Sequence, residues 1–330
     1  MRVVAAVDKF RGTASGAEIA AAIGHACWEQ GHDCVEFALA DGGEGLIEVL
    51  GGPNRTTVVT GPLGTPIEAP WRFHRGTAII EMALASGLVV AGGAEGNDPM
   101  TATTAGTGEL IDAAVTAGAK RIIVGLGGSA TTDGGLGALE AIGAPARLKA
   151  VELLIACDVT TRFTDAATVF GPQKGASPAQ IRMLTGRLEQ LADRYEREYG
   201  VDVRAIDGSG AAGGLGGALA ALGGRLTPGF DLVADELDVY EQLEAADLVI
   251  TGEGHLDAQS FEGKVVGGVA EIAAEHDIPV AAIVGIADDE VRDRIPTWAI
   301  ADRFGEERAI REPLWCVGQV AGEILQRYAG

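Results

Sequence analysis

The chain has little positive charge. Its 330 residues include 25 Lys and Arg against 47 Asp and Glu, which gives a formal net charge of −22 at pH 7. Proteins that bind nucleic acid neutralise backbone phosphates with clustered Lys and Arg, so this composition excludes nucleic acid as a partner. Salt screens the repulsion of a small anion over about 8 Å, and a local group of cations can therefore still bind one.

Cysteines and long apolar runs are also scarce. The four cysteines, Cys27, Cys34, Cys157 and Cys316, form no Cys-x-x-Cys pair and have no histidine at ligand spacing. This pattern argues against a zinc site and against a disulfide framework. The start, MRVVAAVDKF, has too short an apolar run for a signal peptide, and no segment has 18 uninterrupted apolar residues. We therefore expect a cytoplasmic protein without membrane contact.

The familiar ATP-binding motifs are missing as well. There is no G-x-x-x-x-G-K-[ST] segment, so a Walker-type phosphate cradle is absent. The protein-kinase set of G-x-G-x-x-G, V-A-I-K and H-R-D is absent too. Any ATP chemistry in this chain must therefore use another fold.

Lysine is rare, with five residues against twenty arginines. Three of the five, Lys9, Lys174 and Lys264, lie in the glycine-punctuated segments DKFRG, GPQKG and FEGK. A lysine kept where arginine otherwise serves suggests a need for a compact, rotatable ammonium, as at a phosphate site. The alternative is chance, because the chain has 49 glycines.

Short apolar runs, each followed by a glycine-rich turn and a helical pattern, recur along the chain and predict an α/β fold. The clearest runs are 3–7, 35–39, 121–126, 153–157, 247–251 and 280–284. Most are continuous rather than alternating, as in parallel strands buried on both faces. Residues 56–82 differ, because short segments around a GPLGTP turn are consistent with antiparallel strands.

The lysine-bearing segments precede predicted helices. Ser15 with Glu18, and Ser177 with Gln180, form capping boxes that mark helix starts after DKFRG and GPQKG. The segment TGEGHLDAQS likewise leads from a predicted strand towards a helix. Free backbone N–H groups and the helix dipole favour an anion at such positions.

The strongest single signal is GLGGSATTDGGLGAL, residues 125–139, directly after the RIIV run. Glycines allow a close approach of backbone to a ligand, and short hydroxyls add donors. The residues predicted to hold a nucleotide are Gly127, Gly128, Ser129, Thr131, Asp133 and Gly134. One alternative is a tight structural turn. Another is an NAD-dependent dehydrogenase, because residues 125–130 and 208–213 have the shape of a dinucleotide fingerprint, although neither has the expected acidic residue afterwards.

Carboxylates follow several predicted strands. The carboxyl ends of parallel strands line the ligand crevice of an α/β sheet, and acids there suit magnesium ligation and general-base work. Solvated loop acids are the alternative for each one taken singly. The acids are Asp8, Asp41 with Glu44, Asp158, and Glu253 with Asp257.

These segments occur together in a known order. DKFRGTASGAEIAAAI, ADGGEG, TGPLGTPIEA, GLGGSATTDGG, VFGPQKGA, GAAGGLG and TGEGHLDAQSFEGK follow the order of the bacterial glycerate kinase type-1 family, which the chain resembles over residues 1–285. The resemblance implies a two-domain α/β kinase of non-Walker fold. Such an enzyme transfers the γ-phosphoryl of ATP to D-glycerate with Mg²⁺, with 2-phosphoglycerate favoured over 3-phosphoglycerate as the product.

The predicted domain organisation combines a discontinuous and an inserted part. We expect a Rossmann-like parallel-sheet domain at residues 1–57 and 240–330. Residues 58–239 would form a second α/β domain that carries the nucleotide and phosphate loops. A homo-oligomer is compatible with this organisation.

The chain departs from the family pattern at several loops. Members usually read DSFKG where this chain reads DKFRG, so Lys9 replaces a serine and Arg11 replaces the usual lysine. Thr132 stands where Asn is common, His255 where Arg is common, and residues 160–161 where Asn-Pro is common. A kinase for another small hydroxy acid, such as a four-carbon sugar acid, therefore stays an alternative, ahead of a dehydrogenase or a non-catalytic binding module.

Roles for the candidate residues follow as hypotheses. The ammonium groups of Lys174 and Lys264 would neutralise the transferring phosphoryl oxygens. Lys9 and Arg11 would hold the glycerate carboxylate or a phosphate. The other candidates are Asp41 and Glu44 for substrate binding, Asp158, Asp257 and Asp8 for catalysis, and Glu253 with Asp158 for magnesium.

Overall fold

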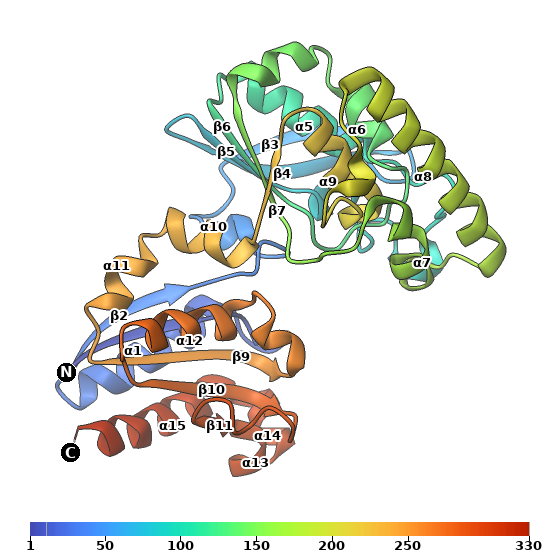
Figure 1. Ribbon diagram of the computed structural model, residues 1–330. Helices are drawn as coiled ribbons and strands as arrows, with labels where there is room; N and C mark the ends of the chain where they lie inside the picture. Colours follow the sequence, from blue (N-terminus) through green and yellow to red (C-terminus); the bar gives the residue numbers. More distant parts are fainter. Residues whose placement is uncertain (11, 330) are drawn as a thin grey trace. The chain divides into compact units, whose positions relative to one another are not determined.

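A computed structural model of the chain describes residues 1–10 and 12–329. The chain divides into two compact units, Met1–Asp41 with Phe230–Gly330, and Gly42–Gly229. The domain boundaries expected from the sequence, after residues 57 and 239, stay a prediction. The two units are described separately below (Figure 1).

The first unit is built on a parallel sheet. In the described part of the chain this sheet has five strands in the order β11-β10-β9-β1-β2, and every neighbouring pair is parallel. The strands are β1 (Arg2–Val7), β2 (Asp33–Ala38), β9 (Leu248–Leu256), β10 (Val280–Ala287) and β11 (Thr297–Ala299). The apolar runs of β1, β9 and β10 are buried, as expected for strands covered on both faces, whereas the residues of β2 are half-buried or exposed.

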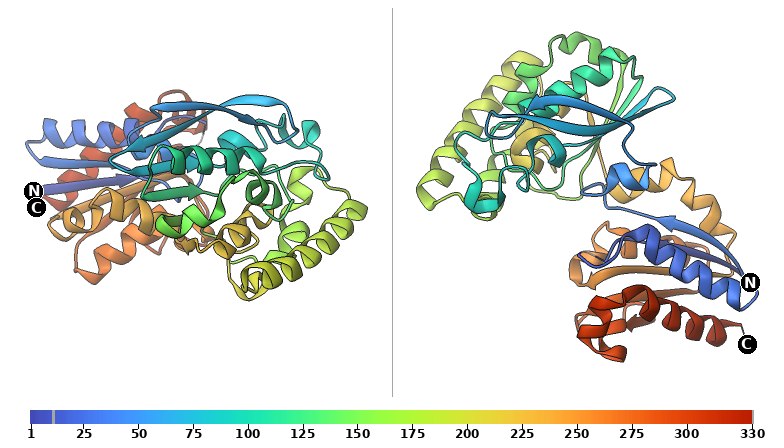
Figure 2. Two further views of the ribbon diagram at one scale, coloured as in Figure 1. Left: turned by 90° about the horizontal axis from the view of Figure 1, so that it is seen from above. Right: turned by 180° about the vertical axis from the view of Figure 1, so that it is seen from behind.

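Helices cover this sheet, and α1 and α15 pack together (Figures 1 and 2). Ser15 and Glu18 form the predicted capping box at the start of α1, and Ile19 and Ile23 are fully buried. Full burial of one such side chain stabilises the fold by about 1.5–3 kcal/mol. The helices are α1 (Gly16–Glu29), α10 (Gly229–Glu236), α11 (Val239–Glu244), η5 (Ala258–Phe261), α12 (Val265–Glu275), α13 (Ile300–Phe304), α14 (Glu306–Arg311) and α15 (Pro313–Tyr328).

The second unit has a mixed sheet. Among the described residues its six strands follow the chain order β3 to β8, and β3, β4 and β5 pair antiparallel whereas β5 to β8 pair parallel. This arrangement confirms the α/β class and the antiparallel character expected for residues 56–82. The strands are β3 (Arg55–Thr60), β4 (Pro66–His74), β5 (Thr77–Glu81), β6 (Arg121–Gly125), β7 (Glu152–Ala156) and β8 (Arg225–Thr227).

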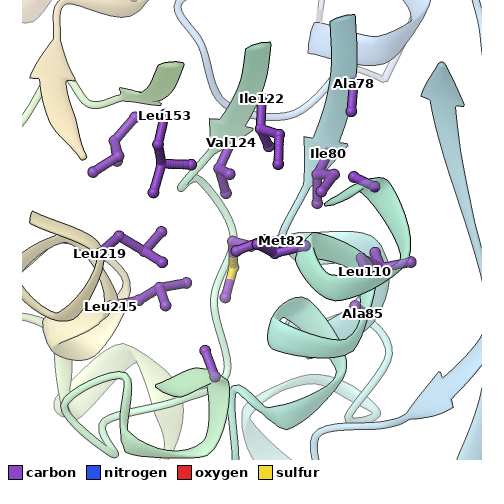
Figure 3. Close-up of a cluster of buried hydrophobic side chains, with 14 of the residues drawn as sticks. Ala78, Ile80, Met82, Ala85, Leu110, Ile122, Val124, Leu153, Leu215 and Leu219 are labelled. Atoms are coloured by element: carbon purple, nitrogen blue, oxygen red, sulfur yellow. The ribbon is translucent and has the colours of Figure 1, made fainter. Parts of the chain in front are cut away.

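The core of the second unit lies between this sheet and its helices. Figure 3 shows Ile80 and Val124 of the strands, Leu110 of α5 and Leu215 of α9 around Met82, all of them within one buried cluster. The helices are α2 (Leu46–Val49), α3 (Ala83–Ser86), α4 (Gly93–Gly96), α5 (Ala105–Thr116), α6 (Leu136–Ala141), η1 (Pro145–Ala150), η2 (Phe163–Asp165), α7 (Ala166–Phe170), η3 (Pro172–Lys174), α8 (Pro178–Tyr199), η4 (Val203–Ala205) and α9 (Ala211–Ala221).

Within residues 1–10 and 12–329, no helix combines the length and the apolar character needed to span a membrane.

Candidate functional site

The candidate residues fall into two groups, one in each unit. Asp8, Lys9, Asp41, Glu253, Asp257 and Lys264 belong to the first unit, whereas Glu44, residues 125–135, Asp158 and Lys174 belong to the second. Arg11, predicted to bind substrate, lies outside the described residues.

In the first unit, three neighbouring strands end in acids. Asp8 directly follows β1, Glu253 lies near the end of β9, and Asp41 comes shortly after β2. Because β9, β1 and β2 are adjacent and parallel, these carboxylates share one edge of the sheet. The charge of Asp41 raises the pKa of Asp8, and the charge of Asp8 raises the pKa of Glu253, so these carboxylates lie close enough to interact.

Burial shifts two of these acids towards neutrality. It raises the pKa of Asp8 to about 6, with a further increase from the charge of Asp41. Burial likewise raises the pKa of Glu253 to about 7, although a hydrogen bond with Ser260 lowers this pKa. The Oε1 atom of Glu253 is buried and has no hydrogen-bond partner among the described residues. A carboxylate with a pKa near 7 and a free oxygen can accept a proton, as a general base must.

Lys264 supplies positive charge beside these acids. Its Nζ lies 4.0 Å from Oδ2 of Asp41, and both side chains are about one-third exposed, at 36% and 30%. Lys264 is also the residue that precedes α12, where the free N–H groups of the helix add partial positive charge. This arrangement leaves a partly open ammonium next to a helix N-terminus, which suits an anionic ligand.

Asp257 and His255 have local partners. The Oδ1 atom of Asp257 accepts hydrogen bonds from N of Ser260 at 3.1 Å and from its Oγ at 3.3 Å, so Asp257 caps η5. His255 Nε2 lies 2.9 Å from Oδ1 of Asp288. The structure therefore gives Asp257 a structural role beside the catalytic one predicted for it.

In the second unit, residues 125–135 form a glycine-rich loop after β6. A Cβ atom on Gly127 would lie 2.8 Å from Cα of Gly43, and one on Gly125 would lie 2.6 Å from O of Gly42. Gly134 and Gly135 have φ values of +67° and +75°. Protein packing and backbone conformation thus account for several loop glycines, as in the structural-turn alternative.

Asp133 is satisfied by the protein itself. Its Oδ2 accepts hydrogen bonds from N and Oγ1 of Thr104, both at 2.8 Å, and from N of Gly137 at 3.2 Å. Its Oδ1 accepts one from N of Gly135 at 3.0 Å. Burial raises the pKa of Asp133 while these bonds lower it. The carboxylate joins the start of α5 to the start of α6, and a ligand would have to displace these donors.

Lys174 lies beneath the glycine-rich loop. The side chain is 2% exposed, and its Nζ donates to Oγ of Ser129 at 2.8 Å and to O of Thr131 at 2.6 Å. Burial lowers the pKa of Lys174 to about 7, against an increase from the charge of Asp133. The ammonium therefore contacts the loop from inside the protein.

Two residues that sequence reasoning missed hold this region together. Asn97 Nδ2 donates to O of Ala130 and to O of Lys174, each at 3.0 Å. Thr104 donates twice to Asp133 and accepts from N of Ala138 at 3.0 Å. Asn97 lies in GGAEGND and Thr104 in TATTAG. Polar residues of these types are ordinary in turns, so no local signal distinguishes them.

The second fingerprint-like segment packs against the glycine-rich loop. Ala212, Gly213 and Gly214 have φ values of 51°, 67° and 100°, and Gly134 N donates to O of Gly213 at 3.0 Å. The element before residues 208–213 is the short helix η4 rather than a strand. A dinucleotide fingerprint requires a strand at that place, so the dehydrogenase alternative lacks its structural context here.

Asp158 follows β7, and its Oδ1 accepts a hydrogen bond from N of Gly229 at 2.6 Å. Beyond it, a hollow of about 600 Å³ is lined by residues that include Thr160, Thr161 and Arg162. The hollow also includes Asp207, whose Oδ1 lies 3.2 Å from Nε of Arg162. Two of the positions at which the chain departs from the family pattern thus border a recess in the surface.

The magnesium ligands predicted from the sequence are Glu253 and Asp158. Among the described residues, no group of three or more His, Cys, Asp or Glu side chains is arranged to hold a metal ion. Mg²⁺ usually needs only one or two carboxylates together with phosphate oxygens and water. The unpartnered Oε1 of Glu253 is compatible with such a ligand. Ligation by Glu253 and Asp158 remains a prediction.

Comparison with known proteins identifies relatives along most of the chain. The model of the glycerate kinase family matches residues 3–147 and 143–304. The chain is 40% identical to the glycerate 2-kinase of Escherichia coli K12, covering 88% of this chain and 87% of that protein. It is 39% identical to the glycerate kinase of Bacillus subtilis 168, over 86% of this chain and 85% of that protein.

A solved structure extends the likeness to the whole fold. The crystal structure of a protein assigned as glycerate kinase 2 from Salmonella typhimurium LT2 superimposes with a TM-score of 0.83 and 35% identity, over 100% of this chain and 98% of that chain. The predicted α/β class and the prediction of a kinase are confirmed by these relatives. On this basis the chain belongs to the glycerate kinase family.

Proposed function

We propose that the protein transfers the γ-phosphoryl group of ATP to a hydroxyl of D-glycerate and releases 2-phosphoglycerate and ADP. The observation that carries this proposal is the group of Asp8, Glu253 and Lys264 at the carboxyl edge of the first unit's sheet. It combines two acids of raised pKa with a partly exposed ammonium. The name of the E. coli relative, glycerate 2-kinase, supports the choice of product.

Glu253 suits the role of the base. It takes the proton of the substrate hydroxyl as the oxygen attacks the γ-phosphorus, and the bond between that phosphorus and the β–γ bridging oxygen breaks to release ADP. The pKa of Glu253 near 7 matches proton uptake at neutral pH. Asp8, with a pKa of about 6, lies close enough for its charge to raise the pKa of Glu253.

The cations and the glycine-rich loop would bind and orient the anionic groups. Phosphoryl transfer needs positioning and charge neutralisation more than covalent chemistry. Lys264 would face phosphoryl oxygens directly because a third of its side chain is open to solvent. Glu253 would hold Mg²⁺, which would supply further neutralisation of phosphate charge.

A coupled assay tests this function. The purified protein is given ATP, Mg²⁺ and D-glycerate together with enolase but without phosphoglycerate mutase. We expect phosphoenolpyruvate, because enolase accepts only 2-phosphoglycerate. Release of ADP without phosphoenolpyruvate would mean the 3-phosphate product, and no ADP release would exclude glycerate as the acceptor.

A second candidate is a kinase for a four-carbon sugar acid. The departures from the family pattern at Lys9, Thr132, residues 160–161 and His255 favour it, and Thr160 and Thr161 border a hollow. Erythronate and L-glycerate are therefore tested beside D-glycerate. A higher kcat/KM for erythronate would make the sugar acid the substrate.

A further inference from the structure

The contact between Lys174 and Ser129 restricts how the serine can bond. An ammonium group carries only donors, whereas a hydroxyl has one donor and two acceptor sites. While Lys174 is protonated, Oγ of Ser129 therefore accepts from the Nζ ammonium in the 2.8 Å bond between them. The proton of the Ser129 hydroxyl is then directed away from Nζ.

That proton has no acceptor among the described residues. Ser129 is buried, with 9% of its surface exposed. Its backbone is held by an isolated antiparallel bridge to Gly87. The hydroxyl is thus a buried donor whose proton has no acceptor in the described part of the protein.

Lys174 itself is poorly placed to touch a ligand. It is 2% exposed, and its ammonium bonds both the hydroxyl of Ser129 and O of Thr131. Asn97 holds the backbone of Lys174 and that of Ala130 together through two bonds from one amide group. This geometry supports the loop rather than a bound phosphate.

We propose that Lys174 is a positioning residue that makes the Ser129 hydroxyl a donor to a phosphoryl oxygen of ATP. This inference rests on the proposed function, and it replaces the direct contact between Lys174 and phosphate predicted from the sequence. A hydroxyl-to-phosphate bond is charge-assisted and hence stronger than a neutral one.

A double-mutant cycle tests the proposal. The steady-state KM for ATP and kcat are measured for Ser129→Ala, Lys174→Met and the double variant. We expect each single change to raise KM for ATP about tenfold, and the double change to raise it no further than the larger single effect. Exposed Lys149, in the last turn of η1, provides the control Lys149→Met, for which we expect unchanged kinetics.

The readouts separate this role from a purely structural one. If Lys174 acted on ATP independently of Ser129, the two effects on KM would multiply to about a hundredfold in the double variant. If Lys174 only stabilised the fold, Lys174→Met would lower the melting temperature and leave KM unchanged. Either outcome overturns the proposal, as does a normal KM for Ser129→Ala. If Lys174→Met does not fold, Lys174→Gln keeps a donor towards Ser129 and should keep KM within about threefold.

The proposed function is judged separately by the wild-type protein. An inactive wild type with every acceptor tested would overturn the function. ATP binding by calorimetry then still tests the positioning role, with an expected tenfold loss of affinity in Ser129→Ala. Unchanged affinity in that variant would overturn the positioning role.

Discussion

Glu253 in the first unit and Asp133 in the second are both partly buried carboxylates, yet their surroundings differ. Asp133 accepts four hydrogen bonds from the protein, whereas Oε1 of Glu253 has no partner among the described residues. A carboxylate with all its acceptor sites occupied holds structure together. One with an unmet acceptor is available for a proton or a ligand, and this difference assigns chemistry to the first and architecture to the second.

The two lysines repeat this contrast. Lys264 is one-third exposed near Asp41, whereas Lys174 is buried against the glycine-rich loop. Both lie in glycine-punctuated segments that the sequence does not distinguish. Exposure therefore separates a group that can touch an anion from one that acts through a neighbour.

The largest effect on activity is expected when Glu253 is replaced. Glu253→Gln removes the base but keeps the shape of the side chain, so kcat for glycerate phosphorylation should fall about a thousandfold. The melting temperature should stay level or rise, because a buried carboxylate is replaced by a neutral amide. Exposed Glu290→Gln is the matched control. A kcat within threefold of wild type would remove Glu253 from the chemistry.

Asp133→Ala should act on stability instead. It leaves the N–H groups of Thr104, Gly135 and Gly137 without their acceptor, which we expect to lower the free energy of unfolding by about 3 kcal/mol. Urea titration at pH 7 measures this change. A variant as stable as wild type but inactive would reverse the assignment and make Asp133 a catalytic group.

Lys264→Met should reduce kcat/KM about a hundredfold, since it removes one donor from the transferring phosphoryl oxygens. Stability should change little, because the ion pair with Asp41 is 4.0 Å long and partly exposed. Steady-state kinetics at saturating glycerate separate the effect on kcat from that on KM for ATP. Equal kinetics in wild type and variant would leave Lys264 as a surface residue.

The smallest effect concerns the pH dependence of stability. The folded pKa of Glu253, about 7, lies above the ordinary value of 4.5, so the folded state binds more protons than the unfolded state between these values. Stability should therefore decline as pH rises from about 4.5 to 7. Glu253→Gln should flatten this decline in melting temperatures recorded across that range. An unchanged slope would mean that other groups, such as Asp8, cause it.

Much of the fold could be predicted from local patterns. The capping boxes at Ser15 and Ser177 are present in the structure, and the apolar runs of β1 and β9 are buried parallel strands. Those signals depend on neighbours within a few residues or on burial of a whole strand. That Asp8 and Glu253 lie at the same edge of the sheet could be predicted because the carboxyl ends of parallel strands share one edge, not because of the residues around them.

The partners of the candidate side chains could not be predicted in this way. Thr104 bonds Asp133 from 29 residues away, and Asn97 bonds Lys174 from 77 residues away. No periodicity or motif reports such a pair, because it forms only when distant loops pack. The glycines of residues 125–135 were therefore interpreted as ligand-facing before their contacts with residues 42–43 and with other protein groups were known.

The sequence by itself determined the α/β class, the helix starts and the resemblance to glycerate kinases, because apolar periodicity, caps and long motifs are local properties of the chain. Only the tertiary structure decided which carboxylate has an oxygen without a partner among the described residues and which lysine is buried. Those properties depend on dehydration and on hydrogen bonds between residues far apart in the chain. The same physical cause raises the pKa of Glu253 and lowers that of Lys174, since burial disfavours the charged form of both.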